Sequence, residues 1–220
     1  CLNVVKLLLD KGAKIETKKR PWGFTPLWIA SHEGHTDIVK LLLDKGAKIE
    51  AKKRPGAFTP LWIASHEGHI DIVELLLEYG AEIEAKENIS NASPLWIAAQ
   101  NGHIEVVRLF LNKSADIEAN TVDGITPLWK ASEEGHTDVV KLLLEHGAGI
   151  EAKQLKTEIT PLWIASQNGH IELVKLLLEK GADVNVKATV NKIEYSPLKI
   201  AEKLRKTKIA ALLKKAGAKK

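Results

Sequence analysis

Histidines recur at a regular interval in this sequence and are the first candidates for chemistry. Five of them follow a glycine, one in each of five successive repeats: His35, His69, His103, His136 and His170. A zinc ion needs its nitrogen ligands about 2.0–2.1 Å from one point, whereas stacked helices lie about 8–10 Å apart. One histidine per repeat therefore does not converge on a metal. We expect these side chains to form hydrogen bonds at a turn between helices, and we predict no metal and no cofactor.

Two segments, His-Glu-Gly-His at 32–35 and at 66–69, resemble the zinc-binding motif of metalloproteases. That motif needs two histidines four residues apart on one helical face. Here they are three apart and a glycine breaks the helix between them, so we reject this site. Ser31, His32 and Glu33 are consecutive, and their side chains diverge around a helix instead of forming a hydrolase relay. No glycine-rich phosphate loop of standard spacing occurs, and we predict no catalytic residue and no enzyme.

Tryptophans form a second periodic set, in the fourth position of a recurring hexad, TPLWIA or a close variant. They are Trp28, Trp62, Trp96, Trp129 and Trp163. A row of aromatic side chains can stack nucleic-acid bases or anchor a partner protein. Alternatively, each indole packs between adjacent repeats and its N–H finds an acceptor there. We favour packing, because the tryptophan recurs beside loops of very different sequence.

The hexad also defines the elements that position these side chains. From each hexad proline to the aliphatic residue after the next Gly-Ala the distance is always 23 residues, while the segment that follows varies between 10 and 13. We predict that the constant part is a packed pair of helices and the variable part a surface loop. Thr25 is expected to cap the first helix with Pro26 in its first turn. Gly34 ends that helix, and Gly46 ends the second.

One helical pair cannot bury its own apolar surface, so we expect identical neighbours to stack in a one-dimensional array. In the segments TPLW, IAS, Gly-His and DIVKLLLDKGAKIE the sequence strongly resembles the ankyrin repeat, over the whole of residues 1–220. The resemblance implies an all-α repeat fold, an ankyrin solenoid of stacked helix-turn-helix units with projecting hairpin-like loops. It implies a single domain with a partial N-terminal repeat unit (1–21), five full units (22–193) and a C-terminal capping unit (194–220).

The sequence departs from the family pattern at a few positions. The family's repeat begins with Thr-Pro-Leu-His. Tryptophan replaces this histidine in the present chain, and Lys199 replaces it in the last unit. A buried ammonium is costly, so we expect that position to be at least partly open to water. Ser114 replaces a glycine, where a left-handed backbone costs about 1 kcal/mol. Residues 1–12 match only a second helix, and we expect the first unit to be incomplete.

The resemblance implies a protein–protein interaction scaffold. The loop tips differ between repeats, as do the first-helix positions that face the concave side in this family, and such variation on a rigid frame is typical of a recognition surface. Arginine and aromatic residues are enriched in binding hot spots, so the basic aromatic tips rank first. We predict partner binding by Lys18, Lys19, Arg20, Trp22, Phe24, His32, Glu33, Lys52, Lys53, Arg54, Phe58, His66, Glu67, Gln100, Asn101, Glu133 and Glu134. Solvated loops without a function would also vary.

The charge distribution supports a rival function. The net charge is +4, yet residues 194–220 contain nine Lys or Arg and only two Glu. This basic unit and the basic tips suit nucleic acid or acidic lipid, through contacts that salt weakens. We favour another protein as the partner. A third alternative is a regulatory array attached to a catalytic or channel domain upstream of Cys1.

The remaining features concern compartment and assembly. Charged residues interrupt every Leu-rich stretch, so the sequence lacks the roughly 18 apolar residues of a membrane span. The single cysteine excludes an internal disulfide. Together with the lack of a visible secretion signal, this favours a cytoplasmic or nuclear protein. We expect it to be monomeric.

Overall fold

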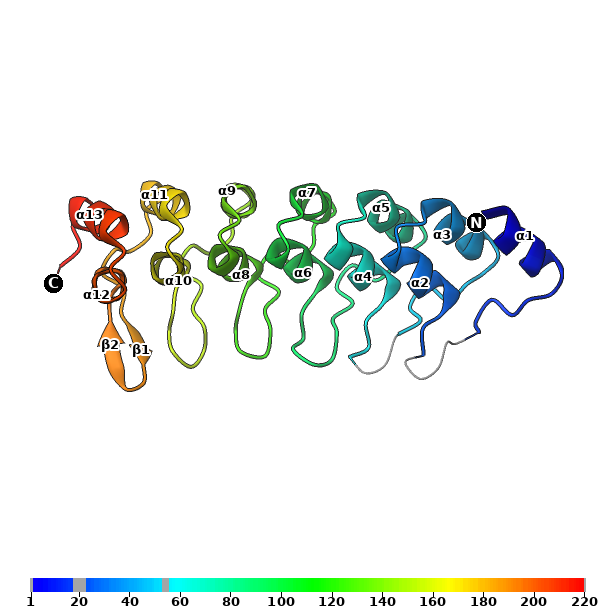
Figure 1. Ribbon diagram of the computed structural model, residues 1–220, viewed down its shortest axis with the longest axis horizontal. Helices are drawn as coiled ribbons and strands as arrows, with labels where there is room; N and C mark the ends of the chain where they lie inside the picture. The colour runs from blue at the N-terminus through cyan, green and yellow to red at the C-terminus, as the bar shows by residue number, and fades with distance from the viewer. Residues whose placement is uncertain (1, 18–22, 53–55, 220) are drawn as a thin grey trace. The chain divides into compact units, whose positions relative to one another are not determined.

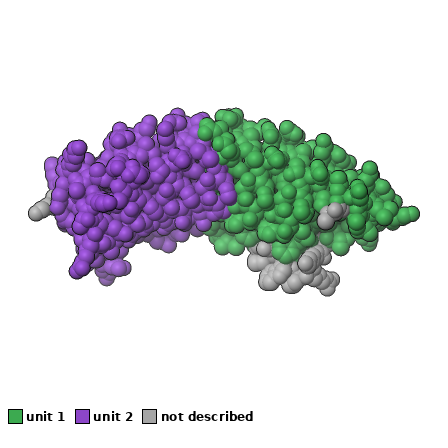
Figure 2. Space-filling view, turned by 45° about the horizontal axis from the view of Figure 1, so that its top comes forward, with its two compact units in different colours: residues 1–98, 105–116 green, residues 99–104, 117–220 purple. Residues whose placement is uncertain are grey.

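The computed structural model describes residues 2–17, 23–52 and 56–219, which form thirteen α-helices and one two-stranded hairpin (Figure 1). The chain divides into two compact units, and we describe each by itself. The first contains residues 1–98 and 105–116, and the second contains residues 99–104 and 117–220 (Figure 2). No helix of the described residues is both long enough and apolar enough to cross a membrane. The single domain expected over residues 1–220 stays a prediction.

The first compact unit repeats a short first helix that begins with proline and a second helix that follows it. Its helices are α1 (Leu2–Asp10), α2 (Pro26–His32), α3 (Thr36–Asp44), α4 (Pro60–Glu67), α5 (Ile70–Glu78), and most of α6 (Pro94–Gln100) and α7 (Ile104–Asn112). The first helices α2 and α4 lie side by side, and the second helix α3 lies between α1 and α5 (Figure 1). First helices therefore stack on first helices, and second helices on second helices, as predicted.

The second compact unit follows the same plan and ends in a hairpin and a last helix pair. Its elements are α8 (Pro127–Glu134), α9 (Thr137–Glu145), α10 (Pro161–Asn168), α11 (Ile171–Glu179), β1 (Ala188–Val190), β2 (Ile193–Tyr195), α12 (Pro197–Lys203) and α13 (Thr207–Lys215). The first helix α10 contacts α8 and α12, and the second helix α11 contacts α9 and α13. This arrangement confirms the all-α repeat fold. The antiparallel hairpin β1–β2 is the only regular sheet of the described residues.

The predicted helix ends are confirmed. The hydroxyl of Thr25 accepts a hydrogen bond from the N–H of Trp28 at 3.2 Å, with Pro26 in the first turn. Gly34 and Gly46 have left-handed φ angles of 75° and 84° just after the two helices. Glycine suits these positions because it has no Cβ to clash there. Ser114, at the position equivalent to Gly46, has a φ of 59°, which is the left-handed conformation that was predicted for it.

The cores lie between the first and second helices of each pair. On the first helices small side chains such as Ala64 and Ser65 are buried beside the larger Leu61 and Trp62, and the Ser65 hydroxyl donates to the carbonyl of Leu61 at 2.7 Å. The small side chains let the second helix approach closely, and its own Ile72 and Leu76 are fully buried. Shape complementarity of this kind is what a packed interior requires.

A row of hydrogen bonds that the sequence did not predict joins consecutive repeats, and we call it the carboxylate ladder. Each glutamate accepts from the backbone N–H of a residue in the next repeat. In the first compact unit the pairs are Glu16–Lys48 (2.8 Å), Glu50–Glu82 (2.9 Å) and Glu84–Asp116 (2.8 Å). In the second they are Glu118–Gly149 (2.7 Å) and Glu151–Asp183 (2.7 Å), and the amide of Asn185 accepts from Lys219 (2.8 Å).

Candidate partner-binding site

Stacked rings connect the base of a loop tip to the surface of a first helix in the first compact unit. Phe58 packs on Trp62 with ring centroids 4.5 Å apart and an interplanar angle of 49°, and Trp62 stacks on His66 at 5.6 Å and 21°. Trp62 is buried, whereas Phe58 and His66 are half-buried. The preceding repeat has the same column, with 4.5 Å between Phe24 and Trp28 and 5.4 Å between Trp28 and His32. We call these two stacks the aromatic columns.

The histidines of the two columns lie in a row with two glutamates, which we call the His-Glu row. His32 Nδ1 is 2.9 Å from Glu33 Oε1, and His32 Nε2 is 3.7 Å from Glu67 Oε1 in the next repeat. Glu67 Oε1 also lies 2.7 Å from His66 Nδ1. All four side chains are between 32% and 56% exposed. These contacts are made by Oε1 of each glutamate.

The equivalent positions of the second compact unit are held by different partners. Glu133 and Glu134 both bind the ammonium of Lys130, at 2.5 and 2.8 Å. Burial lowers the pKa of Lys130, but the hydrogen bonds to the two carboxylates outweigh it and the net pKa is raised. The side chains of Gln100, the last residue of α6, and of Asn101, which follows it, are half-buried. The structure thus brings each predicted first-helix pair to the surface, with a different chemistry in each repeat.

Three of the histidines that follow glycine, His69, His136 and His170, form hydrogen bonds to the preceding repeat, which confirms for them the predicted role at the turn. His69 Nε2 lies 3.0 Å from the carbonyl of His32, and His170 Nε2 lies 2.9 Å from that of Glu133. A Cβ on Gly34 would lie only 2.8 Å from the His69 ring, so the glycine makes room for it. No group of three or more His, Cys, Asp or Glu side chains in the described part of the chain could hold a metal ion.

The tryptophan row is buried and packs between repeats, as predicted. Trp62 Nε1 donates to the carbonyl of Ala92 at 3.2 Å, and Trp129 Nε1 donates to that of Ile159 at 2.7 Å. Both acceptors lie in the loop of the following repeat. In these two repeats the indole N–H therefore has the partner that burial requires.

The sequence comparisons agree with this geometry. The family model described as "Ankyrin repeats (3 copies)" matches residues 1–87 and 85–154, and the model "Ankyrin repeat" matches residues 157–189. The chain belongs to the ankyrin-repeat family. Ankyrin repeats are generally protein–protein interaction modules, and their fold is typically a non-catalytic scaffold. A comparison with curated proteins finds no match.

The ankyrin loop tips are the other part of the predicted surface. Lys18, Lys19, Arg20, Trp22, Lys53 and Arg54 lie outside the described residues. Lys52 is exposed. Phe24 and Phe58 pack against tryptophans in the aromatic columns, and both residues are half-buried.

One ankyrin tip, residues 86–92, is held in place by Glu87, a residue whose role the sequence did not predict. The buried Glu87 carboxylate accepts from the N–H groups of Ile89 (2.6 Å), Ser90 (2.7 Å) and Ala92 (3.1 Å), and from the Ser90 hydroxyl. The N–H of Asn88 donates to Gly56 of the neighbouring tip at 2.9 Å. Burial raises the pKa of Glu87, but these hydrogen bonds outweigh it, and the pKa lies below its ordinary value.

Proposed function

We propose that this ankyrin-repeat chain binds another protein through the His-Glu row and the adjoining loop tips of its first compact unit. The observation that carries the proposal is the half-exposed row of His32, Glu33, His66 and Glu67 above a buried tryptophan layer. Its imidazoles are fixed by stacking and by carboxylate contacts. Side chains that are already ordered lose little conformational entropy on binding, which favours affinity.

The chemistry of the row indicates what the partner presents to it. Carboxylate oxygens accept charge-assisted hydrogen bonds, and arginine is the donor that matches a carboxylate best. We propose an Arg or Lys of the partner beside Glu33 and Glu67. The basic and aromatic tip residues predicted from the sequence, Lys18, Lys19, Arg20, Trp22, Lys52, Lys53 and Arg54, belong to the same proposal as a second contact region.

Affinity enrichment with matched variants tests the proposal. The row variant combines His32→Ala with Glu67→Ala, and the control combines Asp71→Ala with Glu74→Ala, which are exposed on α5. Loss of hot-spot contacts worth about 2 kcal/mol weakens binding roughly thirtyfold. A genuine partner is retained by the wild type and by the control and lost by the row variant. If no captured protein distinguishes the two variants, the row is not the binding site.

A third variant separates the tips from the row. Charge reversal of residues 18–20 and 52–54 leaves the His-Glu row intact. If the tips contribute, the same partner binds this variant more weakly than it binds the wild type. A partner that responds to the tips alone would move the site away from the first helices.

A further inference from the structure

In the second compact unit, the tryptophan of one repeat donates a hydrogen bond to the loop of the next. Trp129 Nε1 bonds to the carbonyl of Ile159 at 2.7 Å, and Trp163 Nε1 bonds to that of Tyr195 at 2.9 Å. In the last repeat this position is taken by Lys199, whose side chain is exposed. Among the described residues no further loop follows 187–195. Lys199 therefore places a cationic donor at the position where Trp129 and Trp163 place an indole N–H.

The hairpin on the same side has an unpaired edge. Thr189 of β1 lies opposite Glu194 of β2, yet the N–H of Thr189 donates to Thr157 in the preceding tip at 2.9 Å. Opposed residues of an antiparallel pair alternate between bonded and non-bonded, so the backbone N–H and C=O of Glu194 point away from β1. No backbone group of the described residues pairs with them. Earlier tips are joined at this kind of edge, as Leu155 N–H is to the carbonyl of Asp123 at 3.0 Å.

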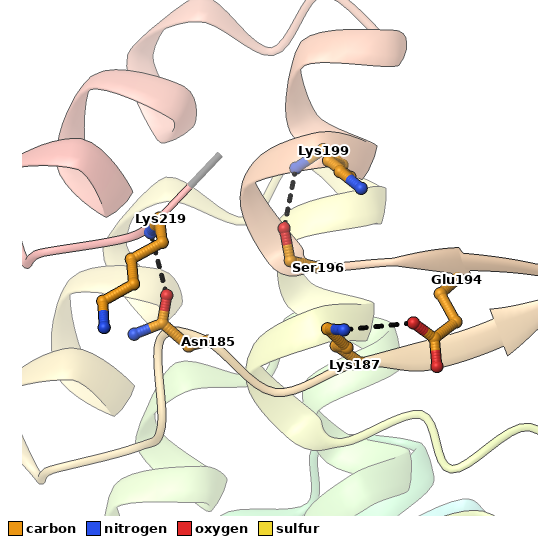
Figure 3. Close-up of a pocket in the computed structure, with 6 residues that line it drawn as sticks. All are labelled: Asn185, Lys187, Glu194, Ser196, Lys199 and Lys219. Atoms are coloured by element: carbon orange, nitrogen blue, oxygen red, sulfur yellow. Dashed lines mark hydrogen bonds and ion pairs between the residues drawn. The ribbon is translucent and has the colours of Figure 1, made fainter.

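A basic pocket adjoins this edge (Figure 3). It has a volume of about 170 Å³ and is lined by Asn185, Lys187, Glu194, Ser196, Lys199 and Lys219. Lys187 is neutralised by Glu194 at 3.1 Å. Within the described part of the chain, no carboxylate lies within 4.0 Å of the Lys199 or Lys219 ammonium. The described lining side chains therefore sum to a charge of +2, three Lys against Glu194.

We propose that the edge of β2 and this pocket together bind an extended acidic segment of another protein. The segment adds a strand beside Glu194 and places its carboxylates at Lys199 and Lys219. Strand addition supplies affinity through the main chain, and side-chain pockets supply specificity. A peptide uses both the edge and the charge, whereas nucleic acid would use only the charge. This site lies in the second compact unit and is independent of the function proposed above.

Fluorescence anisotropy with the whole chain and short labelled peptides tests the proposal. The probe is acetyl-Val-Glu-Val-Glu-Val-amide, and its charge control replaces both Glu with Lys. A second control carries an N-methyl group on the central Val and cannot donate from that position. We expect both controls to bind at least about tenfold more weakly, because the first replaces attraction to the lysines by repulsion and the second loses a main-chain hydrogen bond.

Variants of the protein make the same distinction. Lys199→Glu should weaken probe binding about tenfold, whereas Lys208→Glu, the same charge change at an exposed position of α13 outside the pocket, should change it less than about twofold. Glu194→Pro removes the outward N–H, which no hydrogen bond to a described residue uses, and should also weaken the binding of the probe. If Glu194→Pro unfolds the hairpin, the N-methyl peptide still tests the edge.

Three outcomes overturn the proposal. Equal binding of the N-methylated and unmodified probes means that the edge is not used. Equal losses from Lys199→Glu and Lys208→Glu mean that only the overall charge matters. Tighter binding of a ten-nucleotide oligothymidylate than of the probe, with an affinity that falls steeply with salt, assigns this end of the chain to nucleic acid.

Discussion

The indole Nε1 of Trp163 donates a hydrogen bond to the backbone carbonyl of Tyr195, 32 residues later in the chain, at 2.9 Å. Trp163 is fully buried, and it belongs to a cluster with Trp129, Ile164, Ala188 and Ile200. The cluster joins first helices to the strand β1 of the last loop. A single side chain thus couples the packed frame of one repeat to the loop of the next.

Trp163→Ala should lower the free energy of unfolding by about 3–5 kcal/mol, because it leaves a large cavity. Trp163→Phe keeps most of the apolar volume but leaves the carbonyl of Tyr195 without its donor, and should cost less than the alanine variant. Urea denaturation followed by circular dichroism measures both. A Trp163→Ala protein as stable as the wild type would show that the tryptophan does not hold the repeats together.

The carboxylate ladder should make a measurable contribution to stability. Glu84→Ala removes the acceptor of the Asp116 N–H, which lies 2.8 Å away, and should cost about 0.5–1.5 kcal/mol. Glu74→Ala on the exposed surface of α5 is the matched control and should change stability by less than about 0.5 kcal/mol. Similar values for the two variants in urea denaturation would mean that the ladder is energetically neutral.

A glycine substitution at a loop tip should stabilise the protein. Glu158 has a φ of 56°, in the left-handed region, and the equivalent residues of two other tips are Gly23 and Gly124. Glu158→Gly relieves strain of about 1 kcal/mol, and the ion pair it removes, 3.9 Å long and exposed, is worth little. Asn88→Gly, at a position without a positive φ, should destabilise instead. A lower melting temperature for Glu158→Gly would contradict this prediction.

Features of the fold and of the candidate site could be predicted from the sequence where neighbouring residues in the chain determine them. The cap at Thr25 and the helix end at Gly34 follow from neighbouring residues, and the constant spacing of the hexads predicted the stacked frame. The bond between Glu84 and Asp116 joins residues 32 apart and depends on a rotamer. The stacking of His66 on Trp62 depends on side-chain direction within one helix. Neither contact could be predicted from the sequence pattern alone.

Acid should loosen the tip at 86–92. Hydrogen bonds to Glu87 outweigh its burial and hold its pKa below the ordinary value. The charged carboxylate therefore stabilises the fold above the unfolded pKa of about 4.3, and this stabilisation is lost as the pH falls through the lower, folded pKa. Glu87→Gln should cost about 1–3 kcal/mol at pH 7, and the difference from wild type should shrink below pH 4. Urea titrations at both pH values measure it, and a pH-independent difference would exclude this linkage.

The helix α1 should be the least protected of the second helices. It has no buried residue, and Leu8 is 54% exposed, whereas its equivalent Leu42 in α3 is 1% exposed. The difference arises because α3 packs on the first helix α2, while α1 contacts α3 and is paired with no first helix among the described residues. Local opening is easiest where few apolar contacts resist it. Amide hydrogen exchange should therefore be faster in residues 2–10 than in residues 70–78 of α5. Equal protection in the two helices would mean that the Val4, Leu7 and Leu8 face is covered in solution, and a concentration series of the exchange experiment would show whether a second copy covers it.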